Sequence, residues 1–460
     1  MSTFQALRVH QGPNGRFSRL DTLGLEELTP GEVIVRVAYS SLNYKDALAV
    51  TGKGSILRAL PRTAGIDLAG VVESSSDPDF RPGDRVLATG AGLGESLDGG
   101  LAERARLPGA ALVPLPEALS LLEAMALGTA GFTAALALER MLENHQTPAM
   151  GPVAVTGPTG GVGGIALMLL KRTGFQATAI TGKPDAAARL RELGADAVIE
   201  RSRLESSGKP LEKALWGGAI DSLGGRTLAH LTRTVRPWGN IACIGLAESA
   251  ELDMTVLPLI LRGVSLLGIH SVEVPRAWRL AIWRKLAAEW RLPGLERLMV
   301  RSVIGLEEVP GACEELIAGG ARGRYVVRIG GEPRETDSRR GGGAAYAPGE
   351  TIETPEGIPR KLRTRSSQGD EEAPMVKDIR SGSQAPHAPQ VGAADPERRN
   401  SPTPTDPEQS YELLREQVGD EAAGCYFNDV LYPDGAHVMS GSTRLRCERG
   451  IWVELGEKSG

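Results

Sequence analysis

The chain has 460 residues, 41% of them hydrophobic and 24% charged, which is enough for two or three globular domains with a sizeable core. Its formal net charge of -5 argues against a general electrostatic attraction to nucleic acid or to anionic membranes. No apolar run reaches the length of a membrane span, and the first residues lack the basic flank and apolar core of a signal peptide. We therefore expect a cytoplasmic protein whose partners include neither nucleic acid nor membrane.

Residues 1 to 124 contain short runs in which apolar and polar residues alternate, interrupted by frequent Gly and Pro. A period of two indicates half-buried strands, and the breaks indicate turns. The expected strands cover residues 6–9, 32–37, 69–73 and 84–88. This part of the chain is predicted to form an irregular, β-barrel-like domain.

A helical pattern over 121–142 leads to an apolar run that begins at Val153, a cluster of glycines, and a second helical pattern from Ile165. A helix that starts in such a turn directs free N–H groups and its positive dipole end at an anion, such as a pyrophosphate. Pro158 stands where the first glycine of Gly-x-Gly-x-x-Gly is expected, leaving Gly160 and Gly163. The turn can also serve packing alone, but a strand-like run at 176–180 completes a βαβ unit.

Strands and helices continue to alternate beyond this unit, with strands expected near 197–199, 218–223, 240–244 and 265–269. Such alternation predicts an α/β fold with a doubly wound parallel sheet. A helix at 276–290 carries three tryptophans, which we interpret as a core or interface stripe. A helix at 307–317 and a strand at 323–329 are expected to return to the first domain.

The end of the second strand of this sheet bears on the choice of cofactor. NAD-specific sites place an acidic residue there, about 20 residues beyond the glycine turn, to bind the ribose 2′-OH. No Asp or Glu occurs from Gln176 through Lys183, and the strand ends in Thr181, Gly182 and Lys183. These residues can meet a 2′-phosphate, which favours NADPH. Alternatively, Lys183 is an exposed residue before a helix that starts at Pro184.

Composition changes after residue 330. Residues 331–409 are rich in Gly, Pro, Ser, Thr, Arg and Glu and are predicted to be a disordered linker. Residues 410–460 then read as a short helix at 411–419 and three or four strands, a small β-rich domain with a marginal core. A Cys425–Cys447 bridge or a metal would help to stabilise it, whereas a cytoplasmic location opposes a stable disulfide. The four cysteines have no metal-site spacing, so no metal is expected in the first 330 residues.

Several motifs occur in order along the first 330 residues, at 40–48, 51–54, 65–70, 128–134, 156–163 and 218–224. With these motifs the chain resembles the zinc-independent medium-chain dehydrogenase/reductase superfamily, in the branch of acrylyl-CoA reductases and quinone oxidoreductases. Where zinc relatives carry metal ligands, this chain has the stretches 43–46 and 65–67. The tail from about residue 424 resembles a small bacterial domain of unknown function.

The resemblance implies a GroES-like catalytic domain, residues 1–124 completed by 272–330, around a Rossmann NADP-binding domain at 125–271. It implies NADPH-dependent reduction of the carbon-carbon double bond of acryloyl-CoA or a similar short enoyl-CoA, without metal. The alternatives are a quinone or enone oxidoreductase and a noncatalytic dinucleotide-binding interaction protein. We also expect a homodimer.

The site residues implied by the resemblance lie in two groups. The expected catalytic residues are Tyr44, supported by Asn43, Lys45 and Asp46. The phenol of Tyr44 can donate a hydrogen bond or a proton near a developing anion, or it can only orient the nicotinamide; Lys45 and Asp46 can instead pair on the surface of a turn. The expected cofactor-binding residues are Tyr44, Thr159, Gly160, Gly161, Val162, Gly163, Thr181, Gly182, Lys183, Gly245 and Leu246.

Overall fold

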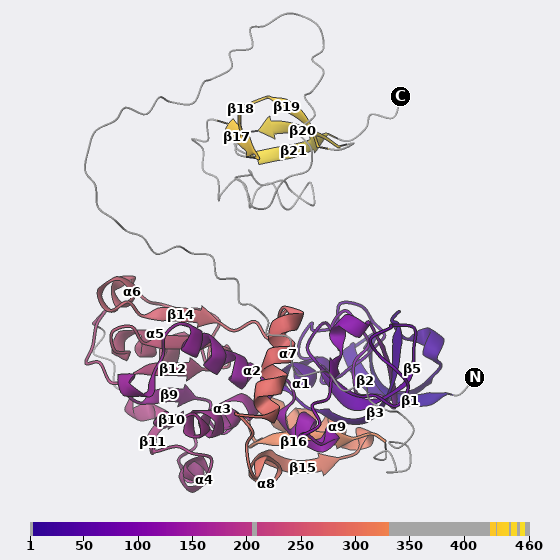
Figure 1. Cartoon of the computed structure of the whole chain (residues 1–460), viewed down its shortest axis with the longest axis horizontal. Helices are drawn as coiled ribbons and strands as arrows, with labels where there is room; N and C mark the ends of the chain where they lie inside the picture. Colours follow the sequence, from indigo (N-terminus) through magenta and orange to yellow (C-terminus); the bar gives the residue numbers. More distant parts are fainter. Residues whose placement is uncertain are drawn as a thin grey trace, which may run out of the picture. The chain divides into compact units, whose positions relative to one another are not determined.

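The computed structural model describes residues 3–204, 209–330, 424–428, 430–440, 443–448 and 451–455. The chain divides into two compact units, Met1–Glu350 and Thr351–Gly460. The linker predicted for 331–409 and the helix predicted for 411–419 lie outside the described residues. Each unit is described by itself below, with the labels of Figure 1.

The α/β part of the first unit contains a six-stranded sheet in the order β11-β10-β9-β12-β13-β14. All its pairings are parallel, as expected for strands connected through helices. The chain starts at β9 in the middle of the sheet, adds β10 and β11 on one side, and then returns to add β12, β13 and β14 on the other side. The strand order therefore reverses between β9 and β12. Doubly wound sheets bind ligands at such a point, at the carboxyl ends of the strands. This confirms the predicted α/β class. The strands are β9 Val153–Thr156, β10 Ala177–Thr181, β11 Ala197–Glu200, β12 Gly218–Asp221, β13 Asn240–Cys243 and β14 Ser265–Gly268.

Helices flank this sheet on both faces (Figure 1). They are α3 Gly161–Arg172, α4 Ala187–Glu192, α5 Gly225–Thr234 and α6 Leu257–Arg262. The faces that α3 and α5 turn to the sheet are apolar, because their aliphatic residues recur every three or four positions. The helix α6 was not predicted from the sequence.

The β-rich part of the first unit contains a seven-stranded sheet and a three-stranded sheet in the order β2-β1-β4. The larger sheet runs β15-β16-β3-β5-β6-β8, with β7 also paired to β3, and β16 is antiparallel to β3, with Val326 opposite Ser41. Residues near 326 therefore complete a sheet begun by residues near 40. The strands are β1 Phe4–Gly12, β2 Gly15–Leu23, β3 Val33–Ser41, β4 Arg62–Thr63, β5 Asp67–Ser75, β6 Arg85–Thr89, β7 Arg104–Leu107, β8 Val113–Pro114, β15 Val300–Ile304 and β16 Arg324–Arg328.

The long helix α2, Leu121–Glu143, packs against both parts of the first unit. It is interrupted at Gly128, whose φ of 50° lies outside the helical region. By length and composition α2 could cross a membrane, but 83% of its most apolar window is buried inside the fold, so it is the core helix. Trp283 packs against its Phe132, and the remaining helices are α1 Tyr44–Val50, α7 Arg276–Ala287, α8 Leu295–Met299 and α9 Val309–Ile317.

The described part of the second unit is a small β structure around Trp452, which is fully buried. Its core contains Phe427 and Leu445 together with a disulfide between Cys425 and Cys447, 22 residues apart. The bridge joins the two sheets of the unit. A disulfide or a metal was expected to stabilise this domain, and the described residues contain the disulfide. The strands are β17 Gly424–Phe427, β18 Val430–Pro433, β19 His437–Ser440, β20 Thr443–Glu448 and β21 Ile451–Leu455.

Candidate active site

The glycine turn after β9 forms the strand-turn-helix unit that the sequence predicts. Gly157 has a φ of 58°, a left-handed conformation that favours glycine, and α3 starts at Gly161. A Cβ on Gly163 would lie 2.5 Å from the carbonyl oxygen of Gly157, so a side chain there would force the helix away from the strand. The N-terminus of α3 is thereby held at the end of β9, where its free N–H groups can bind an anion.

Polar atoms around this turn fit a dinucleotide. The Thr156 hydroxyl donates to Asp221 (2.7 Å) and accepts from the backbone N–H of Ser222 (2.9 Å), which ties the ends of β9 and β12 together. Among the described residues, the buried Ser222 Oγ has no hydrogen-bond partner. A buried hydroxyl without a partner costs free energy unless a ligand or water satisfies it. Its place at the sheet's switch point is where a dinucleotide lies in this fold class.

Of the four predicted catalytic residues at the start of α1, Asp46 is buried, Asn43 and Lys45 are partly buried, and Tyr44 is exposed. Asp46 accepts hydrogen bonds from the backbone N–H groups of Asn43 (2.8 Å) and Ile66 (2.9 Å), which caps the helix. Burial and the nearby Asp67 raise the pKa of the Asp46 carboxyl to about 7. Lys45 instead donates to Glu95 (2.7 Å), so Lys45 and Asp46 do not form the surface pair that the sequence also allowed.

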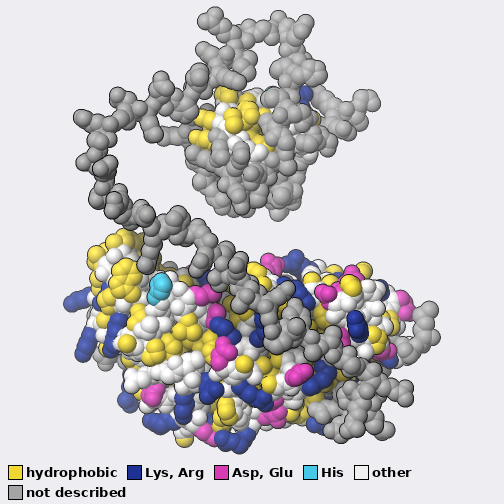
Figure 2. Space-filling view, in the orientation of Figure 1, with side chains coloured by type: hydrophobic (Ala, Val, Ile, Leu, Met, Phe, Trp, Pro, Cys, Tyr) yellow, Lys and Arg dark blue, Asp and Glu magenta, His cyan; other side chains and the backbone are white. Residues whose placement is uncertain are grey.

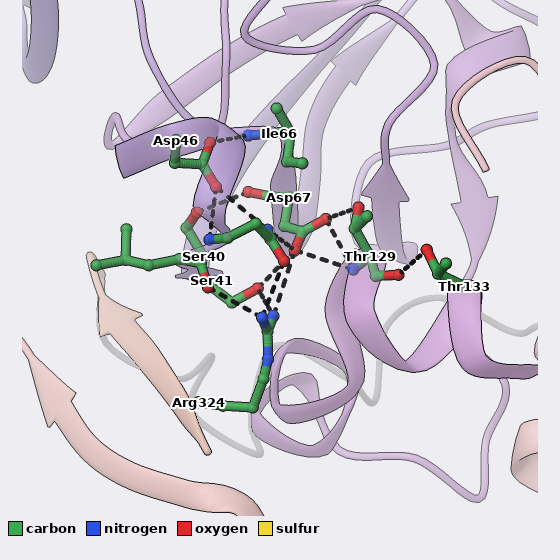
Figure 3. Close-up of polar contacts among 10 residues, drawn as sticks. Ser40, Ser41, Asp46, Ile66, Asp67, Thr129, Thr133 and Arg324 are labelled. Carbon is green, nitrogen blue, oxygen red and sulfur yellow. Dashed lines mark hydrogen bonds and ion pairs between the residues drawn. The ribbon is translucent and has the colours of Figure 1, made fainter. Parts of the chain in front are cut away.

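Asp67 lies at the centre of the hydrogen-bond network in Figure 3. Its carboxylate accepts from Ser41 Oγ (2.6 Å), Asn43 Nδ2 (2.7 Å) and Thr129 Oγ1 (2.6 Å). A Cβ on Gly128 would lie 2.5 Å from this carboxylate, so the break in α2 makes room for it. We call Ser41, Asn43, Asp46, Asp67, Thr129 and Arg324 the Asp67 network.

Arg324, from β16, supplies the positive charge of the Asp67 network. Its guanidinium lies 3.6 Å from the Asp67 carboxylate and donates to Ser41 Oγ (2.7 Å) and to Asn43 Oδ1 (2.9 Å). Both members of the ion pair are almost completely buried, with side-chain exposures of 3% and 0%. Breaking a contact in this buried environment leaves a charged group with neither a partner nor solvent. The ion pair therefore holds the side chains that it contacts in one arrangement.

The Asp67 network also touches the glycine turn. A Cβ on Gly161 would lie 2.8 Å from Arg324 Cδ, and the backbone N–H of Gly323 donates to the carbonyl of Thr159 (3.0 Å). The first residue of α1, Tyr44, follows Asn43 directly and is 55% exposed. Arg324 and its neighbour Gly323 thus link Asn43 to Gly161 and Thr159 of the glycine turn.

The other predicted cofactor residues lie at the ends of neighbouring strands. Thr181 ends β10, and its hydroxyl accepts from the backbone N–H of Lys183 (3.0 Å). The Lys183 ammonium donates to the carbonyl of Gly319, so it is engaged within the protein. Gly245 and Leu246 follow β13, and Leu246 is 66% exposed.

Arg324, Thr129 and the role of Asp67 were not predicted from the sequence. A signal for Asp67 was present, because a carboxylate inside the apolar run at 65–70 needs a buried partner. The partner itself is 257 residues away, and only the pairing of β16 with β3 places it there. Within the described parts of the chain, no three His, Cys, Asp or Glu side chains are grouped so that they could hold a metal ion.

Two family models match parts of this chain, and several known proteins are similar to its first 330 residues. The family model described as "Alcohol dehydrogenase GroES-like domain" matches residues 29–117, and the one described as "Zinc-binding dehydrogenase" matches residues 161–287. "Acrylyl-CoA reductase AcuI" of Ruegeria pomeroyi is 42% identical over 308 residues, 67% of this chain and 93% of the relative.

A second relative, "Putative quinone oxidoreductase YhfP" of Bacillus subtilis, is 45% identical over 331 residues, 72% of this chain and 100% of the relative. Its crystal structure with NAD bound matches with a TM-score of 0.69, over 71% of this chain and 100% of that one. The crystal structure of the yhdH oxidoreductase from Salmonella enterica in complex with NADP is 42% identical, with the same coverage and a TM-score of 0.69.

Proposed function

Since this chain belongs to the medium-chain dehydrogenase/reductase superfamily, in the branch of acrylyl-CoA reductases and quinone oxidoreductases, we propose that it reduces a short enoyl-CoA with NADPH. The product is the saturated acyl-CoA, and acryloyl-CoA is the expected substrate. The relatives that carry this activity in their names are 42% identical to this chain.

The reaction adds a hydride to the β-carbon of the thioester and a proton to its α-carbon, with negative charge on the thioester oxygen in between. NADPH, when bound, supplies the hydride. The protein must bind the pyrophosphate, stabilise the developing oxyanion and provide a proton. We assign the first task to the N-terminus of α3 at Gly161–Gly163, and the second to the hydroxyl of Tyr44. Asn43 and Asp46 act as positioning residues, because they fix the start of α1.

One observation supports this assignment above all others. Arg324 contacts both Asn43, which precedes Tyr44, and the position of Gly161 in the glycine turn. The residue that precedes Tyr44 and the turn proposed to meet the pyrophosphate thus lie against one buried arginine. A reductase needs such a fixed relation, since hydride transfer depends on the orientation of cofactor and substrate.

The test is the oxidation of NADPH by the full chain with acryloyl-CoA, with a quinone, and with no acceptor. Turnover with acryloyl-CoA well above that with the quinone supports the proposal. A preference for the quinone supports the second candidate, which the identity to YhfP favours. If NADPH binds and neither acceptor is reduced, the chain is a noncatalytic dinucleotide-binding protein and the enzymatic proposal is wrong.

We further propose a homodimer that forms through β14. This strand is at the edge of the six-stranded sheet, so its outer N–H and C=O groups can pair with a second copy. Beside it, hydrophobic side chains are exposed in the region of α6 (Figure 2). The exposed hydrophobic residues of this region are Trp238, Val256, Leu257, Ile260 and Leu261. Light scattering of the full chain measures the mass, and a monomer at micromolar concentration contradicts the proposal.

A cytoplasmic location is the last part of the proposal. Disulfides persist mainly in oxidising compartments, so the Cys425–Cys447 bridge of the second unit provides a test. Thiols trapped by alkylation during cell lysis report the state of this pair. Free thiols agree with the cytoplasm, whereas a bridge that is already closed in the cell contradicts it.

A further inference from the structure

The core of the second unit is small, and a cystine forms part of it. Its buried side chains are Cys425, Phe427, Val438, Leu445, Cys447 and Trp452. A core of this size buries little apolar surface, and natural domains with such cores usually need a disulfide or a metal to stay folded. The described residues contain no group of side chains that could hold a metal ion. The stability of this unit therefore depends on the Cys425–Cys447 bridge.

The bridge connects two separate sheets of the second unit. Cys425 lies on β17, in the two-stranded sheet β17-β18, and Cys447 lies on β20, in the centre of the sheet β19-β20-β21. A two-stranded sheet is at best marginally stable in water. The indole N–H of Trp452 donates to the carbonyl of Tyr426 (2.8 Å), and the disulfide is the covalent link between the same two sheets. Opening the bridge leaves β17 and β18 attached to the core by noncovalent contacts alone.

Closing the bridge changes the folding equilibrium of the second unit. The two cysteines are 22 residues apart, and a cross-link of that length raises the equilibrium constant for folding by about 100-fold. By thermodynamic linkage the folded state favours closure of the bridge by the same factor, because it holds the two sulfur atoms together. Folding and oxidation of this unit are therefore one coupled process.

The two cysteines outside the bridge, Cys243 and Cys313, lie in the first unit. Cys313 is buried and Cys243 is partly buried. Burial raises the pKa of the Cys243 thiol to about 11 and also raises the pKa of the Cys313 thiol. Thiol exchange requires the thiolate, so both thiols are almost entirely in the unreactive form at pH 7. The response of this chain to thiol reductants is thus confined to the second unit.

We propose that the second unit is a redox switch, which is folded while the Cys425–Cys447 bridge is closed and unfolds when a dithiol reduces it. One thiolate of the dithiol attacks a cystine sulfur, which breaks the S–S bond and forms a mixed disulfide. The other thiol then displaces the second cysteine, so the dithiol becomes a disulfide and the cystine gains two electrons and two protons. Both cysteines are fully buried, so the attack requires the unit to open.

The switch has opposite states in reducing and oxidising surroundings. In a reducing cytoplasm the pair is two thiols and the unit is unfolded, whereas an oxidant closes the bridge and the unit folds. The first unit, which carries the proposed reductase site, contains neither cysteine of the pair. The inference therefore does not depend on the proposed function, and the first unit should have the same fold in both states.

The test measures hydrogen exchange of the full chain by mass spectrometry, once oxidised and once reduced with dithiothreitol. Two backbone N–H groups report on the second unit: that of Cys447 donates to the carbonyl of Ala436 (2.8 Å), and that of Gly435 donates to the carbonyl of Cys447 (2.8 Å). Reduction should accelerate exchange in 424–455 by about 100-fold. Peptides of the first unit should not change, and removal of the reductant with reoxidation should restore the slow exchange.

The double variant Cys425→Ala with Cys447→Ala should exchange rapidly in 424–455 whether or not the reductant is present. Cys243→Ala is the matched control, because it removes a cysteine outside the bridge and should keep the wild-type response. The inference is overturned if the reduced wild type exchanges as slowly as the oxidised protein, or if the double variant stays protected. It is also overturned if Cys243→Ala abolishes the response, because the switch would then not belong to the Cys425–Cys447 pair.

Discussion

The two ends of the proposed cofactor site treat charge in opposite ways. In the Asp67 network the carboxylate and the guanidinium of Arg324 are buried, and each makes several hydrogen bonds inside the protein. At the cavity beside the ends of β10 and β11, Arg201 is exposed, and its charge helps to lower the pKa of Glu248 in the same lining. The first arrangement is fixed when the chain folds, whereas the charges of the second remain accessible to solvent.

The difference predicts how substitutions act at each end. Removing one member of a buried, hydrogen-bonded pair leaves a charge without solvent, so stability and geometry are lost together. Removing an exposed cation costs little stability and affects only the ligand that it binds. The following experiments test this contrast, from the largest expected effect to the smallest.

Arg324→Met should produce the largest effect, a loss of about 3–5 kcal/mol in the free energy of unfolding of the first unit, because Asp67 is then buried without its cation. Urea denaturation measures it. The double variant Arg324→Met with Asp67→Asn should recover part of the loss, since the unpaired charge is gone. If Arg324→Met is as stable as the wild type, the Asp67–Arg324 pair is not needed for stability. The two ends of the site would then not differ in how substitutions act.

Asp46 should make the stability of the first unit depend on pH. Its pKa of about 7 in the folded protein is above the ordinary value of 3.8 for an exposed carboxyl, so the folded state holds the proton more tightly. The contribution is complete below about pH 4 and is lost as pH rises through about 7, by roughly 2–4 kcal/mol. Denaturation of wild type and Asp46→Asn at pH 5 and pH 8 measures it, and equal pH dependence in the two proteins contradicts the expectation.

Tyr44→Phe should lower kcat by about 100-fold, as expected for a group that donates to a developing anion. The dissociation constant of NADPH should change little, because the hydroxyl acts on the transition state. Steady-state kinetics and a binding titration separate the two effects. Weaker NADPH binding with an unchanged maximal rate would assign Tyr44 to orienting the cofactor.

Lys183→Ala should have a smaller effect, a loss of about tenfold or less in NADPH affinity with NADH unchanged. The reason is that Lys183 gives up its hydrogen bond to Gly319 if it moves to the phosphate. Fluorescence titration beside Arg201→Ala sharpens the comparison. A loss that is equal for both cofactors would mean that Lys183 serves the fold and not the phosphate.

Local patterns in the sequence determined the elements and the class of the fold. The alternation of apolar runs and glycine-terminated helices predicted the doubly wound sheet, and the clustered glycines predicted the turn at Gly157–Gly163. Both predictions depend on residues within a few positions of each other. At that range, backbone sterics and the spacing of apolar residues determine the local conformation. The helix α1 was not predicted, although the residues that cap it, Asn43 and Asp46, are only three positions apart.

Only the tertiary structure decided which charges meet. Asp67 and Arg324 are adjacent because β16 pairs with β3 after the chain has traversed the whole cofactor sheet. Arg201 faces Gly182 because β11 pairs with β10 in register, Glu200 beside Thr181. From the sequence, Lys183 was expected to bind a phosphate, but in the folded chain its ammonium donates to the carbonyl of Gly319, 136 residues away. Long-range pairing is set by the packing of whole sheets, and no local pattern encodes it.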